Sequence, residues 1–192
     1  MPEKLAKIFY SSKTLQTAKN LLGKYLVRKY RGKIISGMIV ETEAYTGQND
    51  PGSHAYKSRT PRNEPMFGPP GRAYVYFCYG NHFLFNIVTE KEGTAGAVLI
   101  RALEPKQGIE TMKKLRKTNE IIKLTNGPGK LTQALAIGRN DNRADLNGNE
   151  LYVASGTPSR HKIASGSRIG IKQGLDKKWR FWISGNPYVS VK

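Results

Sequence analysis

The pattern of apolar and polar positions is most informative in residues 38–45, Met-Ile-Val-Glu-Thr-Glu-Ala-Tyr. β-Branched side chains dominate this stretch and a glycine stands close to each end, which predicts a strand. Because the side chains of a strand alternate between its two faces, Glu41, Glu43 and Tyr45 share one face. Small and β-branched side chains occupy the other face. Two carboxylates and an aromatic ring are therefore expected side by side on the central strand.

The paired carboxylates allow two interpretations. An ionised carboxylate is costly to bury without a partner, so it usually changes its pKa or pairs with a cation. A carboxylate next to an aromatic wall is what a general base beside a flat substrate requires. The alternative is that Glu41 and Glu43 form ordinary ion pairs on an exposed edge strand, since structural ion pairs are common.

The remaining pattern predicts a chain rich in short strands. Apolar residues at helical spacing indicate a helix that begins near Ser11 and ends near Gly23. Helical spacing recurs in a basic segment, 105–123, and in 131–137. Strands are predicted at 25–30, 97–103, 151–154, 168–171 and 180–184, with a hairpin over 73–88 that turns at Gly80-Asn81.

Together these elements predict a single domain of mixed α/β (α+β) class. We expect a curved, mainly antiparallel sheet with surrounding helices and a protruding β-hairpin. The domain is expected to span residues 1–192, with residues 1–10 as a frayed leader. The sequence shows no internal repeat and no linker.

Residues 47–71 form a long segment without periodicity, rich in Gly, Pro, Asn, Ser and Arg. A structureless stretch of this length inside a compact domain is usually functional. It contains His54, Arg62 and Met66. A lone histidine in a polar loop is usually a surface residue, so the loop position alone gives His54 no role.

The net charge indicates a polyanionic partner. The chain has 32 Lys and Arg against 14 Asp and Glu, a formal charge of +18. Such a field favours nucleic acid, and the alternatives are a basic solubility surface or adsorption to an anionic membrane. The basic residues are interspersed with aromatic residues, glycine and proline over the whole chain. That distribution favours a folded nucleic-acid-binding surface over membrane adsorption.

Cysteine and histidine usage excludes several classes of site. The single cysteine, Cys78, excludes an internal disulfide and a multi-cysteine metal site, and the three histidines lack metal-ligand spacing. The chain has no apolar run of about 18 residues, which a membrane span needs. It also lacks an apolar signal segment at its start. We expect a cytoplasmic protein without metal or cofactor, associated with the nucleoid if bacterial.

Five ordered, non-repetitive motifs carry a family resemblance. They are Val-Glu-Thr-Glu-Ala-Tyr at 40–45, Thr-Pro-Arg-Asn at 60–63, Tyr-Val-Tyr at 74–76, Leu-Ile-Arg-Ala-Leu-Glu-Pro at 99–105 and Pro-Tyr-Val-Ser-Val at 187–191. In this order they resemble the alkyladenine (3-methyladenine) DNA glycosylase family. The resemblance extends from about Leu21 to Val191.

The resemblance implies roles for individual residues. Glu43 matches the catalytic general base, which activates a water for attack on C1′ of the sugar, and Arg101 matches the arginine that helps to hold this water. A backbone carbonyl within 169–171 is expected to complete the water site. The matched substrate-binding residues are Tyr45, His54, Tyr76, Asn86 and Leu99. The matched DNA-binding residues are Tyr79, Arg62, Met66 and Lys130.

Some of these assignments have ordinary structural alternatives. The resemblance implies that Tyr79 intercalates where the base has left the helix, as an aromatic wedge would. The alternative is a tyrosine that packs on the sheet. Arg62 and Lys130 are phosphate contacts or merely solvated charges. Asn86 matches the residue that obstructs the 2-amino group of normal guanine.

The implied activity is that of a monofunctional DNA glycosylase in base excision repair. It would flip and excise 3-methyladenine and 7-methylguanine, together with deaminated or etheno purines such as hypoxanthine and ethenoadenine. Cation–π contacts of roughly 0.5 to 2 kcal/mol would favour a cationic alkylated base. No lysine stands at a matched pocket position, which implies hydrolysis without a Schiff base. The expected partner is the minor groove of double-stranded DNA, and the expected state is a monomer.

The hairpin provides a geometric prediction. With a two-residue loop at Gly80-Asn81, Tyr76 and Asn86 would face opposite sides of the sheet. If both line one pocket, the hairpin needs an odd-length loop or a bulge between them. We predict such an irregularity.

Two other functions compete with base excision. A non-catalytic nucleic-acid-binding module would bind DNA without releasing any base. A hydrolase acting on free nucleosides or RNA would not need a charge of +18 or a wedge residue at Tyr79. The helix-hairpin-helix glycosylases have the same activity, but the chain contains no matching hairpin followed by Lys or Asp.

Overall fold

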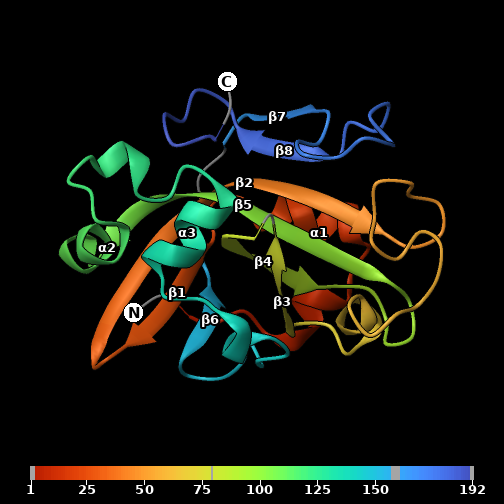
Figure 1. The fold of residues 1–192 in the computed structure, drawn as a ribbon, viewed down its shortest axis with the longest axis horizontal. Helices are drawn as coiled ribbons and strands as arrows, with labels where there is room; N and C mark the ends of the chain where they lie inside the picture. Colours follow the sequence, from red (N-terminus) through yellow and green to blue (C-terminus); the bar gives the residue numbers. More distant parts are fainter. Residues whose placement is uncertain (1–2, 79, 157–160, 191–192) are drawn as a thin grey trace.

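The structure is a computed structural model that describes residues 3–78, 80–156 and 161–190 (Figure 1). Its strands are β1 (Tyr25–Tyr30), β2 (Lys33–Thr46), β3 (Ala73–Cys78), β4 (His82–Val88), β5 (Gly96–Gln107), β6 (Leu151–Ala154), β7 (Ile163–Gly166) and β8 (Arg180–Ile183). Its α-helices are α1 (Thr14–Asn20), α2 (Ile109–Arg116) and α3 (Pro128–Ala134). Short 3₁₀ turns are η1 (Lys7–Ser11), η2 (Glu64–Phe67), η3 (Ile121–Lys123) and η4 (Arg139–Asp141).

All of these strands belong to one antiparallel sheet, in the order β3-β4-β5-β2-β1-β6, to which β8 and β7 are added beside β2. The long strands β2 and β5 cross the middle of the molecule, and the sheet curls around them (Figure 1). The predicted α+β class with one curved antiparallel sheet is therefore confirmed.

The central strand is enclosed on both sides. One side of β2 pairs with β5 over most of its length, and the other side pairs first with β1 and then with β8. Glu41 and Glu43 lie opposite Trp182 and Arg180 of β8, and both glutamates are fully buried. The alternative of an exposed edge strand is therefore wrong.

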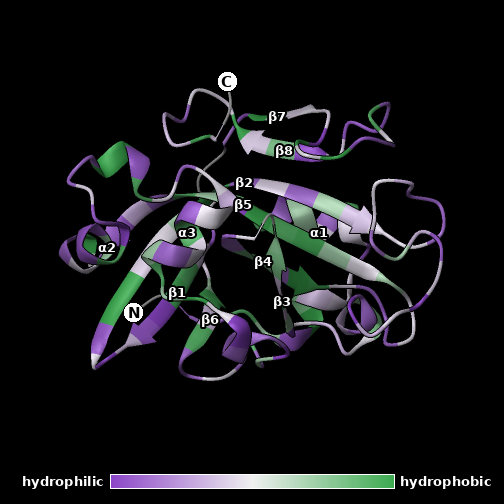
Figure 2. Cartoon of the chain, in the orientation of Figure 1, coloured by the Kyte–Doolittle hydropathy of each residue, from purple (hydrophilic) through white to green (hydrophobic). Residues whose placement is uncertain are grey.

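The main core lies between the sheet and its helices. Helix α1 packs behind β2, where the Thr42 hydroxyl donates to the carbonyl of Ala18 at 2.9 Å. Helix α3 covers β4 and β5. Apolar residues concentrate along the central strands, whereas the turns at the periphery are hydrophilic (Figure 2). Among the described residues, no helix has both the length and the apolar character needed to cross a bilayer.

The hairpin has the odd-length loop that the sequence predicts. Cys78 of β3 pairs with His82 of β4, so an odd number of residues, three, separates this pair along the chain. Tyr74 stands opposite Asn86, and Tyr76 stands opposite Leu84. These four side chains therefore share one face of the sheet, as a common pocket requires.

Two predicted elements differ from the structure. Residues 168–171 do not form a strand, because Gly170 has a φ of 79°, a left-handed conformation that interrupts an extended run. The strand that pairs with β8 is Ile163–Gly166. The predicted helical segment 105–123 is a helix only over Ile109–Arg116, since β5 continues through Gln107 and Lys117 is left-handed at φ 52°.

The start of the chain is also more ordered than expected for a frayed leader. The Leu5 backbone N–H donates to the carbonyl of Val153 in β6 at 2.9 Å. Tyr10 is fully buried and packs in the main core. From residue 4 onward, the segment therefore lies against the sheet through backbone pairing and an aromatic anchor.

The sheet offers a matched test of core packing. Phe85 on β4 is fully buried, whereas Phe77 on neighbouring β3 is 45% exposed. Phe85→Ala should lower the free energy of unfolding by about 3–5 kcal/mol, because it removes a full ring from the core and leaves a cavity. Phe77→Ala should cost about 1 kcal/mol, mostly its tilted ring contact with Phe83. Urea denaturation measures both, and equal losses would contradict the described burial.

Candidate active site

A cavity of about 380 Å³ lies on the face of the sheet opposite α1. Strands β2 to β5 form its floor and walls, and loop 47–71, residues 169–171 and the start of α3 complete it. The predicted site residues that line it are Tyr45, His54, Met66, Tyr76, Asn86, Leu99, Arg101 and Lys130. The structure thus brings most of the predicted set, from distant parts of the chain, to one place.

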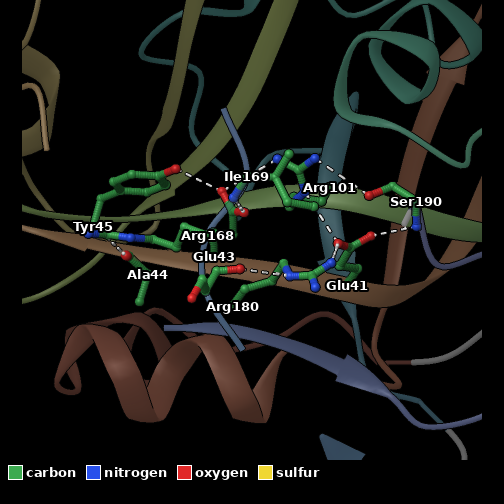
Figure 3. A network of polar contacts seen from close by, with 10 residues as sticks. Glu41, Glu43, Ala44, Tyr45, Arg101, Arg168, Ile169, Arg180 and Ser190 are labelled. Carbon is green, nitrogen blue, oxygen red and sulfur yellow. Dashed lines mark hydrogen bonds and ion pairs between the residues drawn. The ribbon is translucent and has the colours of Figure 1, made fainter. Parts of the chain in front are cut away.

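Glu43 is not itself among the residues that line the cavity, and its side chain is fully buried, but its partners line it. Its Oε1 accepts a hydrogen bond from the Ile169 backbone N–H at 2.7 Å, and its Oε2 accepts one from the Tyr45 hydroxyl at 2.7 Å. Arg101 Nη1 forms an ion pair with Oε2 at 3.4 Å. Three residues that line the cavity therefore hold the carboxylate against it (Figure 3).

Burial raises the pKa of Glu43 above its ordinary value, because the ionised form loses its hydration. The Arg101 charge, the Ile169 N–H and the Tyr45 hydroxyl oppose this rise in pKa, and the neighbouring Glu41 charge adds to it. Burial and Glu43 also raise the pKa of Tyr45 well above 10, so the Tyr45 hydroxyl keeps its proton and donates a hydrogen bond to Glu43. A raised pKa makes the ionised Glu43 a stronger base than an exposed carboxylate.

Arg101 joins the two buried glutamates. Its Nε lies 3.3 Å from Glu41 Oε1, and its Nη1 contacts Glu43. Glu41 is also held by Arg180 Nη1 at 3.1 Å and by the Ser190 backbone N–H at 2.7 Å (Figure 3). Glu41 is therefore the structural carboxylate of the pair, because Arg180 and Ser190 are not among the residues that line the cavity, whereas Tyr45 and Ile169, which hold Glu43, are.

A local irregularity in the sheet accompanies this arrangement. Ile39 pairs with Leu103, Glu41 with Ala102 and Thr42 with Ile100, so the register shifts on both strands within a few residues. Such bulges re-aim side chains and are common next to active sites. The shift lies at Arg101 and places its guanidinium between the two carboxylates.

Three rings form an aromatic wall. His54 lies edge-on to Tyr76, with ring centroids 4.8 Å apart, and Tyr74 lies 5.1 Å from Tyr76. His54 Nδ1 is 3.0 Å from the Tyr74 hydroxyl, which fixes the orientation of the imidazole. Burial and the nearby Arg62 charge lower the pKa of His54, so the ring is neutral at pH 7. Burial raises the pKa of Tyr74 to about 12.

Asn86 and Leu99 stand opposite each other on β4 and β5, and both are buried. The Asn86 amide Nδ2 donates to the Tyr74 carbonyl across the hairpin at 3.0 Å. This bond fixes the side-chain amide in the cavity wall. Leu99 also lies opposite Glu43, so it forms an apolar surface next to the carboxylate.

The predicted DNA-binding residues fall in different places. Arg62 lies over the Tyr76 ring at 5.5 Å. Lys130, which the resemblance matches to DNA binding and not to the pocket, donates to Asn126 Oδ1 at 2.8 Å and also lines the cavity. Met66 is 2% exposed and lies in the cavity wall, so its DNA-binding role stays a prediction. Tyr79 lies outside the described residues.

Several residues of the site escaped the sequence analysis. Tyr74 belongs to a matched motif, and its two-residue spacing from Tyr76 could have placed it on the same wall. Asp50 and Arg168 form a fully buried ion pair beside Tyr45. No local sequence pattern predicts this pair, because its partners are 118 residues apart in the sequence.

Comparison with known proteins agrees with this geometry. The model of the methylpurine-DNA glycosylase family matches residues 8–187. A protein of Prosthecochloris aestuarii is 55% identical over 95% of this chain and 88% of its own length. Relatives from Carboxydothermus hydrogenoformans and Clostridium acetobutylicum are 52% and 48% identical, each over 98% of this chain and at least 98% of their own length. All three carry the name "Putative 3-methyladenine DNA glycosylase".

The two buried glutamates should respond oppositely to neutralisation. Because the pKa of Glu43 is raised in the folded state, its contribution to stability is present below the unfolded value of 4.5 and is lost as pH rises through the folded pKa. Glu43→Gln should therefore increase the free energy of unfolding at pH 8, with no gain below pH 4.5. Urea denaturation across this pH range measures the difference.

Glu41→Gln is the matched control on the same strand. It removes the ion pairs that Glu41 forms with Arg101 and Arg180 and should cost about 3–5 kcal/mol at pH 8. Equal destabilisation by the two substitutions would contradict the distinct roles of the two carboxylates.

Proposed function

The chain belongs to the methylpurine-DNA glycosylase family, and from its site we propose that it excises 3-methyladenine and other damaged purines from DNA by hydrolysing the N-glycosyl bond. The observation that carries this proposal is the buried Glu43 carboxylate, held by Arg101 and the Ile169 N–H beneath an aromatic cavity. A carboxylate, a fixed cation and flat walls are the groups that hydrolysis at a purine nucleotide needs.

The cavity supports recognition of a flipped base. Its volume of about 380 Å³ lies in the range of ligand pockets, about 300–1,000 Å³. A base inside a duplex cannot reach it, so the damaged nucleotide must leave the stack, which is easiest where damage weakens pairing. Tyr45, His54 and Tyr76 would form the walls against which the purine packs. Tyr79 is proposed as the wedge that fills the gap.

Glu43 would act on the attacking water. Ionised Glu43 accepts the proton of a water aimed at C1′, while Arg101 helps to hold this water. The same negative charge stabilises the oxocarbenium-like transition state, in which positive charge develops on the sugar. Lys130 Nζ donates to Asn126 Oδ1, so we propose that Lys130 does not attack the sugar and that hydrolysis proceeds without a covalent intermediate. We assign Lys130 a phosphate contact instead.

Two arginines weaken the preference of the cavity for cationic bases. The guanidinium of Arg168 lies over the Tyr45 ring at 4.6 Å, and that of Arg62 lies over the Tyr76 ring at 5.5 Å. Each ring therefore already has a cation–π contact with an arginine, which weakens its attraction for a second cation. This favours a pocket that accepts neutral damaged purines, such as hypoxanthine and ethenoadenine, as well as cationic 3-methyladenine and 7-methylguanine.

Asn86 is proposed as the residue that keeps normal guanine out. Its amide is buried in the wall and fixed by a hydrogen bond to the Tyr74 carbonyl. A fixed polar group of this kind discriminates by steric conflict with the 2-amino group of guanine. Adenine and hypoxanthine lack this amino group. 7-Methylguanine keeps it, so we propose that its excision depends on the weaker glycosidic bond of the cationic base.

The partner is DNA, and we propose that the protein binds the minor groove as a monomer. The charge of +18 supports electrostatic attraction to the phosphates. A binding-only module is the competing function. A binding-only module would not require a buried glutamate with a raised pKa whose partners line a cavity. The presence of Glu43 therefore favours the enzyme.

The catalytic assignment predicts that Glu43→Gln lowers the single-turnover rate of base release by about 10²- to 10⁴-fold, as expected for loss of a general base. The assay measures free 3-methyladenine released from a methylated duplex, with borohydride added in parallel to trap any Schiff base. DNA binding should persist in the variant, and no trapped adduct should form. Wild-type protein that binds this duplex without releasing base would establish the binding-only function instead.

Phosphate contact by Lys130 predicts a change in salt dependence. Lys130→Ala should reduce the slope of log K against log salt concentration by about 0.9, the value for one lost contact. Lys33→Ala is the control, because Lys33 is exposed at the far end of β2. Its slope should equal that of the wild type. Equal effects of the two substitutions would show that charge alone, without position, governs binding.

A further inference from the structure

A fully buried ion pair lies next to the proposed catalytic carboxylate without taking part in the chemistry described above. Arg168 Nη1 and Nη2 donate to the two oxygens of Asp50 at 2.6 and 2.5 Å, and both side chains are 0% exposed. The bidentate geometry fixes the guanidinium in one plane. Burying an ion pair has a large desolvation cost, so a buried pair is weak evidence for stability, and another role for it has to be considered.

The pair connects three segments that meet at the cavity. Arg168 Nη1 also donates to the carbonyl of Ala44, between Glu43 and Tyr45 on β2, and its guanidinium lies over the Tyr45 ring (Figure 3). Asp50 accepts hydrogen bonds from the backbone N–H groups of Thr46 and Gly52, where β2 passes into loop 47–71. The residue after Arg168 is Ile169, whose N–H holds Glu43.

The loop backbone is shaped to admit the guanidinium. A Cβ added to Gly52 would lie 2.7 Å from Arg168 Nη2 and 2.9 Å from the Ile171 side chain. A Cβ added to Gly174 would lie 3.0 Å from the same nitrogen. Two glycines therefore allow the chain to close around the pair from two directions.

We propose that Asp50 and Arg168 are positioning residues that hold the Ile169 N–H against Glu43 and the Tyr45 ring in the cavity wall. The inference rests on the proposed function. Without the pair, the Arg168 guanidinium is no longer held in one plane against Ala44 of β2, and the hydrogen bond from the Ile169 N–H to Glu43 Oε1 loosens. Excision then slows, because the general base Glu43 is misplaced, whereas the DNA-binding surface is unchanged.

A change in the pH profile distinguishes positioning from general stability. The Ile169 N–H lowers the pKa of Glu43, so its loss should move the acid limb of the excision profile to higher pH. The other titratable or charged groups that face Glu43 within the described residues are Glu41, Tyr45, Tyr76, Arg101 and Arg168. Asp50→Asn substitutes none of them, and Arg168 is the one whose partner it removes.

The experiment compares Asp50→Asn with the wild type in single-turnover release of 3-methyladenine from a methylated duplex. We expect the maximal rate to fall by between about tenfold and a hundredfold. The half-saturating enzyme concentration should stay within about threefold, because positioning affects the chemical step. The acid limb should shift to higher pH. An unchanged acid limb, or a loss confined to binding, would overturn the proposal.

Asp141→Asn is the matched control. Asp141 pairs with Arg28 at 2.6 Å, with side chains that are 12% and 17% exposed, and the pair lies outside the cavity. This variant should lose thermal stability but keep the maximal rate and the acid limb. If it shifts the limb as Asp50→Asn does, the effect is one of general stability and the proposal fails.

A second variant decides the case if Asp50→Asn does not fold. Gly52→Ala keeps both charges and displaces the guanidinium by steric contact alone. The amide proton of Ile169, hydrogen-bonded to a carboxylate, should resonate downfield in the wild type and in Asp141→Asn, and move upfield in Gly52→Ala. An unmoved resonance would refute the proposal. Because this reading needs no base release, it remains decisive even if the wild type proves inactive and the proposed function fails.

Discussion

The burial of an ionisable carboxylate on a central strand is the constraint on which the rest of the structure depends. Glu43 is fully buried between β5 and β8, where an ionised group without partners would be prohibitively costly. Its partners come from three separate parts of the chain: Tyr45 on the same strand, Arg101 on β5 and the Ile169 N–H near the end of the sequence. The charge is stable only where all three converge, so the fold and the site specify each other.

The sheet achieves this convergence through departures from regular pairing. The odd-length hairpin loop turns Tyr76 and Asn86 to the same face, and the register shift between β2 and β5 aims Arg101 at both glutamates. A regular sheet with the same sequence would send part of this set to the opposite side. The irregularities are therefore as necessary to the site as the residues themselves.

The sequence predicts local features well and remote partners poorly. The face shared by Glu41, Glu43 and Tyr45 follows from alternation along one strand. The same alternation, applied to the two strands of the hairpin, correctly predicted the odd-length loop. The burial of Met66 did not follow from its polar loop, because it depends on packing against a sheet that the loop pattern does not show. The Asp50–Arg168 pair was likewise hidden, since only the closed fold brings its partners together.

The most direct test of the central claim is the affinity for two abasic duplexes, one with a cationic pyrrolidine and one with a neutral tetrahydrofuran at the lesion. A carboxylate placed against C1′ should make the wild type bind the cationic duplex more tightly at pH 8, since this ligand resembles the charge of the transition state. Glu43→Gln should lose this preference while it keeps its affinity for the neutral duplex. Equal affinities in the wild type, or a preference that survives the substitution, would contradict the assignment of Glu43 to the reacting sugar.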